Sequence, residues 1–300
     1  MVLSRVIRTR WRTWVIPSLL GVALLGVLSL AGAQPASFGK APYAILLSMD
    51  GARPDALQEV GASWLLEEAS YTWKARTIFP SVTLPAHASM VTGLTPRRHG
   101  ITQNRWNPGM PPIEVPTLFD YVKARGRTTA MVISKEKLGA LARPGAVDRV
   151  EVVRGRAAVV AERAIAVLTQ EKPGFLFIHF SDPDVMGHLH GWMSRPYLDA
   201  VSRTAAAVGR ILKTAQEEKS RSFFAVITSD HGGHGTIHGT RSPEDMTIPW
   251  IALGDQVRRG HEIRVEVRID DTTPTILFAL GIPVPASLEG KVISEIFTSP

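Results

Sequence analysis

The sequence predicts an α/β fold with a mostly parallel central sheet and helices on both faces. Three continuous apolar runs are typical of strands that are buried on both sides, as in parallel sheets. Segments with helical spacing lie between them, and this alternation is typical of α/β proteins. The predicted strands are 44–49, 175–180 and 223–228, with two more near 128–133 and 248–253. The predicted helices are 117–125, 156–170 and 197–217.

The length and composition fit one domain with a sizeable core. The chain has 300 residues, of which 45% are hydrophobic and 20% are charged. These values are ordinary for a globular protein. The chain contains no cysteine, which excludes disulfides, thiolate nucleophiles and sulfur-ligated metal sites.

The N-terminal segment has the features of an export signal. Four arginines in the first 12 residues precede a mostly apolar run, 15–30, which ends in Ala31-Gly32-Ala33. This order is typical of a secretory signal peptide with a small-residue cleavage site. We therefore expect a signal peptide, 1–33, one domain, 34–300, and a periplasmic or secreted protein. An uncleaved membrane anchor is the alternative, although the run is short for a membrane span.

Removal of this segment lowers the net charge. The whole chain carries a formal charge of +7, and the four arginines of the leader contribute four of these charges, which leaves +3 for the mature protein. The remaining basic residues are scattered, so the balance does not predict nucleic-acid binding. We expect no nucleic-acid partner and no membrane association after leader cleavage, whereas the oligomeric state stays open.

Acidic residues follow three of the predicted strands. Asp50 comes directly after the first, Asp184 after the second and Asp230 after the third. Because the carboxyl ends of parallel strands meet at one edge of a sheet, we expect these carboxylates in one crevice. A single such aspartate would be explained as a helix or turn cap. Three of them, two with histidine close by, favour a functional site.

Histidines lie close to two of these acids. His188 comes four residues after Asp184, and His231 and His238 follow the third acid among several glycines. Imidazole and carboxylate without thiolate suit catalytic Zn²⁺. The six candidate ligands, enough for two ions, are Asp50, Asp184, His188, Asp230, His231 and His238. His234 is expected to orient a ligand, and the rest of the nine histidines are expected to be structural.

Thr83 is the candidate nucleophile. It stands where a helix N-cap would, and Pro85 fits the first turn of that helix. The exposed N–H groups at a helix N-terminus favour a bound phosphate. A capping role alone would explain this threonine. Beside metal ions, however, a coordinated hydroxyl loses its proton more easily and becomes a nucleophile.

Six motifs in a fixed order carry a family resemblance. They are Ser48-Met49-Asp50-Gly51, Phe79 to His87, His99-Gly100-Ile101 with Asn104, Asp184 to His188, Ser229-Asp230-His231-Gly232 and His238-Gly239. In this order they resemble the type I phosphodiesterases/nucleotide pyrophosphatases of the alkaline phosphatase superfamily. The resemblance implies an alkaline-phosphatase-like fold and a two-zinc phosphoester hydrolase that acts on a small phosphorylated substrate.

The resemblance also implies a role for each residue. One zinc ion would be held by Asp50, Thr83, Asp230 and His231, and the other by Asp184, His188 and His238. Mn²⁺ is the alternative metal. Thr83 would attack phosphorus and form a phosphothreonine intermediate, while Asn104 would hydrogen-bond a non-bridging phosphate oxygen.

Several departures from the family pattern leave the substrate open. Leu84 and His179 stand where nucleotide-cleaving members often have aromatics that stack on the base. Lys135 and Lys137 resemble a lysine pair that binds substrate in phosphonoacetate hydrolases, although a solvated surface would also explain them. A phosphomonoesterase or phosphonate hydrolase is therefore the alternative activity. An inactive binding protein of the cell envelope is the alternative of another class.

Overall fold

The computed structural model describes residues 41–218 and 222–298. These residues build an eight-stranded sheet with the order β4-β3-β5-β1-β6-β7-β2-β8. The expected leader, 1–33, lies outside the described residues. Among the described helices, none combines the length and the apolar character that a membrane crossing requires.

Three predicted strands form the centre of the sheet. β1 (Tyr43–Met49) pairs in parallel with β5 (Phe175–Phe180) on one side and with β6 (Phe223–Thr228) on the other. Every residue of these strands is buried, as their continuous apolar runs predicted. The predicted α/β fold class is confirmed.

The outer strands make the sheet mixed. β3 (Thr129–Ile133) and β4 (Arg149–Val152) continue the parallel arrangement beside β5. β7 (Thr247–Gly254) runs antiparallel to both β6 and β2 (Ala69–Arg76), and β8 (His261–Glu262) is parallel to β2. Within the described ranges, β7 is the one strand that runs against the rest. β2, β4 and β8 were not predicted, because they are short or mix polar with apolar residues.

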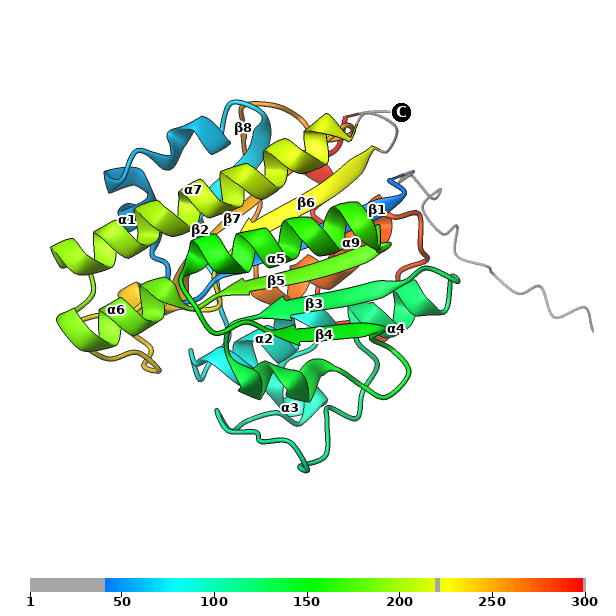
Figure 1. Cartoon of the computed structure of the whole chain (residues 1–300), viewed down its shortest axis with the longest axis horizontal. Coiled ribbons are helices and arrows are strands. Elements are labelled where there is room, and N and C mark those ends of the chain that lie inside the picture. Colours follow the sequence, from blue (N-terminus) through cyan, green and yellow to red (C-terminus); the bar gives the residue numbers. More distant parts are fainter. Residues whose placement is uncertain (1–40, 219–221, 299–300) are drawn as a thin grey trace, which may run out of the picture. The chain divides into compact units, whose positions relative to one another are not determined.

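Helices cover both faces of the sheet (Figure 1). The helices on one face are α1 (Pro54–Glu59), α5 (Ala157–Gln170) and α7 (Arg195–Glu217). The helices on the other face are α2 (Thr83–Thr92), α4 (Leu118–Lys123) and α9 (Thr272–Ala279). Alternate residues of β1 point to the two cores, Ile45 and Leu47 to the first and Ala44 and Leu46 to the second.

Three short helices lie next to the loops at the sheet's edge. They are α3 (Pro96–His99), α6 (Asp182–His190) and α8 (Pro243–Met246). Of these, α6 follows β5 and α8 precedes β7. The loop after β6 extends from Ser229 to Ser242 before α8 begins. The carboxyl ends of β1, β5 and β6 therefore open onto one set of connections.

Candidate metal centre

The three strand-end carboxylates lie together at the carboxyl edge of the sheet. Asp50 follows β1, Asp184 lies in the first turn of α6, and Asp230 follows β6. Asp50 and Asp230 have no exposed surface, and Asp184 is 4% exposed. Lys135, from the loop after β3, links two of them, because its Nζ lies 2.6 Å from Asp50 Oδ2 and 2.6 Å from Asp184 Oδ2.

Each carboxylate makes its hydrogen bonds within the described residues through one oxygen. Asp50 Oδ2 lies 2.8 Å from His179 Nε2 as well as against the Lys135 ammonium. Asp230 Oδ1 accepts the backbone N–H groups of Gly51 and His231, both at 3.1 Å. These donors orient the carboxyl groups and leave the second oxygen of each for another ligand.

Four buried atoms in this cluster have no hydrogen-bond partner among the described residues. They are Asp50 Oδ1, Asp184 Oδ1, Asp230 Oδ2 and His231 Nε2. Buried polar atoms are nearly always paired, because an unpaired one loses its hydration without compensation. Three anionic oxygens and an imidazole nitrogen form a donor set for a cation, and carboxylate with imidazole suits Zn²⁺. The residues present therefore fit a metal.

The candidate ligand atoms fall into two groups, and within each group all atoms lie within 4.8 Å of one another. The first group is Asp50, Asp230 and His231, and the second is Asp184, His231 and His238. His231 thus belongs to both groups, whereas the family resemblance assigned it to one ion only. His188 Nε2 lies 3.4 Å from Asp184 Oδ1, the same oxygen that His238 Nε2 approaches at 3.5 Å.

Backbone carbonyls orient the three histidines. The Nδ1 contacts are His188 to Thr236 O at 2.9 Å, His231 to Gly232 O at 2.8 Å and His238 to Ser81 O at 2.9 Å. A carbonyl only accepts, so each Nδ1 carries the proton and each Nε2 turns a lone pair towards the acids. Metal-binding histidines are commonly held in this way. Burial lowers the pKa of His231 and that of His238, the latter to about 4, which keeps both rings neutral near pH 7.

The Lys135 ammonium is too little positive charge to keep all three carboxyl groups, those of Asp50, Asp184 and Asp230, ionised. Burial alone would raise the pKa of Asp50, but the Lys135 ammonium and the His179 hydrogen bond outweigh it and hold that pKa well below its usual value. Burial and the charge of Asp50 raise the pKa of Asp230 well above its usual value. One ammonium therefore does not keep all the carboxyl groups ionised. A divalent cation would favour the ionised form of each.

Thr83 lies next to the same cluster of side chains. It is the first residue of α2, and Val82 is the N-cap, so the predicted capping position was wrong by one residue. Lys135 Nζ lies 3.4 Å from Thr83 Oγ1. His87, one turn further, donates from Nδ1 to Thr83 O at 2.8 Å, and its Nε2 lies 2.7 Å from Ser48 Oγ. This histidine ties the start of α2 to β1.

Asn104 accepts two hydrogen bonds through its side-chain oxygen. Its Oδ1 accepts the backbone N–H of Leu84 at 3.0 Å and the Lys137 ammonium at 2.9 Å. With both donors on the oxygen, the two amide hydrogens on Nδ2 stay available for an acceptor such as a phosphate oxygen. Lys137 therefore contacts Asn104, whereas Lys135 contacts the acids and Thr83.

The structure corrects the expectations for His179 and His234. Leu84 is 1% exposed and His179 is fully buried, so neither lines a surface on which a base would stack. His179, expected to be structural, contacts the candidate ligand Asp50 instead. His234 does not orient a ligand, because its Nδ1 pairs with Asp245 Oδ1 at 2.7 Å. A histidine inside an apolar strand was the available signal for His179, since a buried imidazole needs a polar partner.

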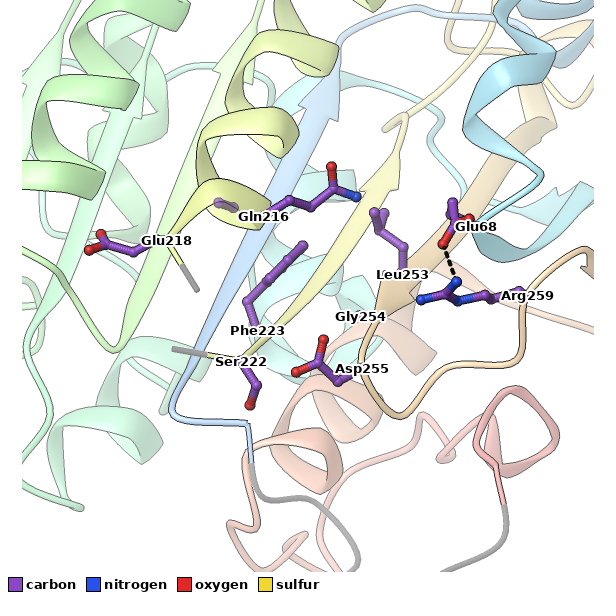
Figure 2. A pocket seen from close by; sticks show the side chains of 10 residues that line it. Glu68, Gln216, Glu218, Ser222, Phe223, Leu253, Gly254, Asp255 and Arg259 are labelled. Carbon is purple, nitrogen blue, oxygen red and sulfur yellow. Dashed lines mark ion pairs between the residues drawn. The ribbon is translucent and has the colours of Figure 1, made fainter. Parts of the chain in front are cut away.

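A separate pocket lies at the other end of β6 (Figure 2). It measures about 170 Å³, and its lining includes Phe223 and the ion pair of Arg259 with Glu68 at 3.0 Å. Phe223 begins β6 and Asp230 follows its end, so they are roughly 20 Å apart at about 3.3 Å per residue. None of the candidate metal ligands lines this pocket, and it is not part of the metal centre.

The family is shown by comparison with known proteins. Residues 44–242 match the model of the type I phosphodiesterase / nucleotide pyrophosphatase family. The chain belongs to this family. Its members are metal-dependent phosphoester hydrolases, which agrees with the carboxylate and histidine groups described above.

Curated relatives match over part of their length. The chain is 28% identical to mouse ectonucleotide pyrophosphatase/phosphodiesterase family member 1 over 224 residues, which cover 66% of this chain and 24% of the mouse protein. It is 27% identical to a 2,3-bisphosphoglycerate-independent phosphoglycerate mutase of Ectopseudomonas mendocina over 145 residues, 46% of this chain and 26% of the mutase. The chain thus matches about a quarter of the length of these relatives.

Solved structures share the fold. Murine ectonucleotide pyrophosphatase / phosphodiesterase 5 in complex with AMP superposes with a TM-score of 0.71 at 14% identity, covering 85% of this chain and 100% of that one. A 2-O GAG sulfatase superposes with a TM-score of 0.70 at 14% identity, covering 85% and 74%. At such identities the likeness supports the alkaline-phosphatase-like fold and says nothing about the substrate.

Proposed function

We propose that this protein is an exported two-zinc phosphoester hydrolase with Thr83 as its nucleophile. The observation that carries the proposal is the set of four unpartnered buried ligand atoms, in a crevice that also contains Thr83. Family membership supports the reaction class. An inactive binding protein would have no need of such a donor set together with a hydroxyl beside it.

The proposed ligands divide into two sets. Asp50, Asp230 and His231 with Thr83 would hold one ion, and Asp184, His188 and His238 would hold the other. Zinc suits these ligand types, and Mn²⁺ is the alternative. When bound, the ions supply Lewis-acid chemistry, which lowers the pKa of a coordinated hydroxyl and withdraws charge from phosphoryl oxygens.

The chain's own residues bind and orient the phosphoryl group. Thr83 Oγ1 attacks phosphorus in line with the leaving alcohol, so that a Thr83–phosphorus bond forms while the bond to the leaving oxygen breaks. The threonine proton ends on the released alcohol. Asn104 Nδ2 donates to a non-bridging oxygen, and the N-terminal end of α2 favours the anion. Water then displaces Thr83 from phosphorus and releases the phosphate product.

The direct test is a substrate panel on the mature protein loaded with zinc. The panel contains a nitrophenyl phosphate monoester, a nitrophenyl diester, nucleotides and phosphonoacetate. We expect zinc-dependent hydrolysis of at least the simple aryl esters, and covalent phosphate on Thr83 when a slow substrate is quenched with acid. A protein that holds zinc but turns over no member of the panel would support the binding-protein alternative.

A second activity is favoured by the two lysines. Lys135 contacts Thr83 and the acids, and Lys137 contacts Asn104, so two cationic side chains border the crevice. A phosphomonoester or phosphonate carries more negative charge than a diester and gains more from such groups. The alternative is therefore a phosphomonoesterase or a phosphonate hydrolase of the phosphonoacetate type, and the same panel separates it from a phosphodiesterase.

Export is the remaining part of the proposal. The sequence pattern of 1–33 supports a cleaved leader and a periplasmic or secreted enzyme. The mature protein should then begin at or near Gln34 when its N-terminus is sequenced from the periplasm or medium. Recovery of an intact N-terminus in the membrane fraction would support the anchor instead.

A further inference from the structure

His179 is a buried imidazole beside the candidate metal centre with partners on both ring nitrogens. It lies in β5, between Ile178 and Phe180, and has no exposed surface. Its Nε2 lies 2.8 Å from Asp50 Oδ2, and its Nδ1 lies 3.1 Å from Ser134 Oγ. The ring thus bridges the loop after β3 and the acid after β1.

The partners of the ring decide which nitrogen carries the proton. An ionised carboxylate only accepts hydrogen bonds, so Nε2 carries the proton and donates it to Asp50. Nδ1 is then the acceptor and faces the Ser134 hydroxyl. A buried imidazole without such partners would be costly in an apolar strand.

The hydrogen bond separates the two oxygens of Asp50. Oδ2 is held by His179 and also contacts Lys135, whereas Oδ1 has no hydrogen-bond partner among the described residues and lies 3.5 Å from His231 Nε2. Lys135 is shared with Asp184 and is partly exposed, with 17% of its side chain accessible. His179 is the donor that is fixed in position by the sheet and dedicated to this oxygen.

We propose that His179 is a positioning residue that makes Asp50 bind a metal ion through Oδ1 alone. Asp230 is oriented by backbone N–H groups, which no side-chain replacement removes. Asp50 depends on a side chain, so its geometry is open to substitution. Without His179, the partly exposed Lys135, which is shared with Asp184, is the side chain left to hold Oδ2 among the described residues. The carboxyl group is then less firmly fixed and can offer both oxygens to the ion. The inference rests on the metal centre of the proposed function.

The test compares donors placed at different points of the same side-chain position. His179→Gln puts an amide donor near the place of Nε2, His179→Asn reaches only as far as Nδ1, and His179→Phe keeps the ring without a donor. His99→Phe is the matched control, because His99 is also buried and hydrogen-bonded to a serine, Ser89. Its hydrogen bonds within the described part of the chain involve no candidate ligand. Circular dichroism establishes which variants fold.

The readouts are zinc affinity, measured by competition with a chromophoric chelator without substrate, and the visible spectrum of the Co²⁺-loaded protein. Loss of a group that orients a ligand costs about 10- to 100-fold in metal affinity. We expect that loss at one site in His179→Phe and His179→Asn, with a cobalt spectrum altered by the change in coordination. The zinc affinity of His179→Gln should stay within about tenfold of that of wild type. The zinc affinity of His99→Phe should equal that of wild type.

Equal zinc affinities in the Gln and Asn variants would overturn the proposal, and this comparison decides even if the Phe variant does not fold. Equal affinities in wild type and His179→Phe would overturn it too. Wild-type protein that binds zinc but hydrolyses no phosphoester refutes the proposed function alone, because zinc binding is measured without substrate. Wild-type protein that binds no zinc refutes both.

Discussion

The two halves of the candidate metal centre differ in how firmly the protein holds them. In the half built on Asp50, Asp230 and His231, every side chain is fully buried. In the half built on Asp184, His238 and His188, the exposed fractions of the side chains are 5%, 8% and 45%. The buried half is anchored by backbone N–H groups and His179, whereas Asp184 Oδ2 is held by Lys135, a long and partly exposed side chain.

This difference in burial predicts different roles for the two halves. Ligands that are already fixed lose little freedom when a metal binds, so the buried half should hold its ion more tightly. The half with the larger exposed fractions is the one that solvent and a substrate oxygen can reach. Thr83 lies beside Lys135, which contacts an acid of each half. In the proposed mechanism, the nucleophile would therefore have an acid of each half close by.

The largest effect is expected from Thr83→Ala. It removes the attacking oxygen, so hydrolysis should fall on the order of 10³-fold or more. Most of the zinc should be retained, because the other proposed ligands of that ion, Asp50, Asp230 and His231, remain. Initial rates and metal analysis of the purified variant measure both. Thr83→Ser keeps a hydroxyl and should retain part of the activity. Turnover by the alanine variant at the wild-type rate would exclude the mechanism.

The next effect compares the two halves directly. Asp230→Asn should weaken zinc binding at the buried half more than His188→Asn weakens it at the open half. The loss in Asp230→Asn should reach at least the roughly 10- to 100-fold that removal of a group orienting a ligand costs. The reason is that Asp230 is a fully buried ligand and His188 is a partly exposed one. Zinc titration of both variants, with rates measured at saturating zinc, provides the numbers. Equal losses of zinc affinity in the two variants would show that the two halves do not bind their ions with different affinity.

A smaller effect is expected from the double variant Lys135→Ala with Lys137→Ala. A hydrogen bond from an ammonium to a charged group changes affinity or rate by roughly tenfold or more. The loss of turnover should therefore be about tenfold larger for a monoester or phosphonate than for a diester. The ratio of kcat/KM for the two nitrophenyl substrates measures this. If both substrates lose activity alike, the lysines have no part in the choice of substrate.

The smallest effect concerns the base of a nucleotide. Base stacking on an aromatic contributes about 1–3 kcal/mol, and the buried Leu84 and His179 offer no such surface. The values of kcat/KM for the common nucleoside triphosphates should therefore lie within about tenfold of one another. A stronger preference would point to Trp106, which is partly exposed. Trp192 is a poorer candidate, because it is 7% exposed and donates to Gly51 O at 2.9 Å.

The sequence predicted the parts of the site that follow directly from strand order. Asp50 and Asp230 end apolar runs, and parallel strands bring such ends to one edge. The contact of His179 with Asp50 was not predictable, because it depends on β5 lying beside β1, a pairing that no local pattern specifies. His87 was missed for a similar reason, since its partner Ser48 lies on another element. Short strands such as β4 and β8 have too few residues to show the alternation of apolar and polar residues that indicates a strand.

The place of β1 in the sheet has a consequence for how the protein is made. β1 is the first of the described strands to leave the ribosome, yet its Ala44 pairs with Phe175 on one side and with Phe224 on the other. Its two neighbours are thus synthesised long after it, and contacts between such distant segments make folding slow. Until then an apolar strand with two open edges stays unpaired, which invites aggregation. A holding chaperone that shields β1 during synthesis would therefore raise the yield of folded enzyme.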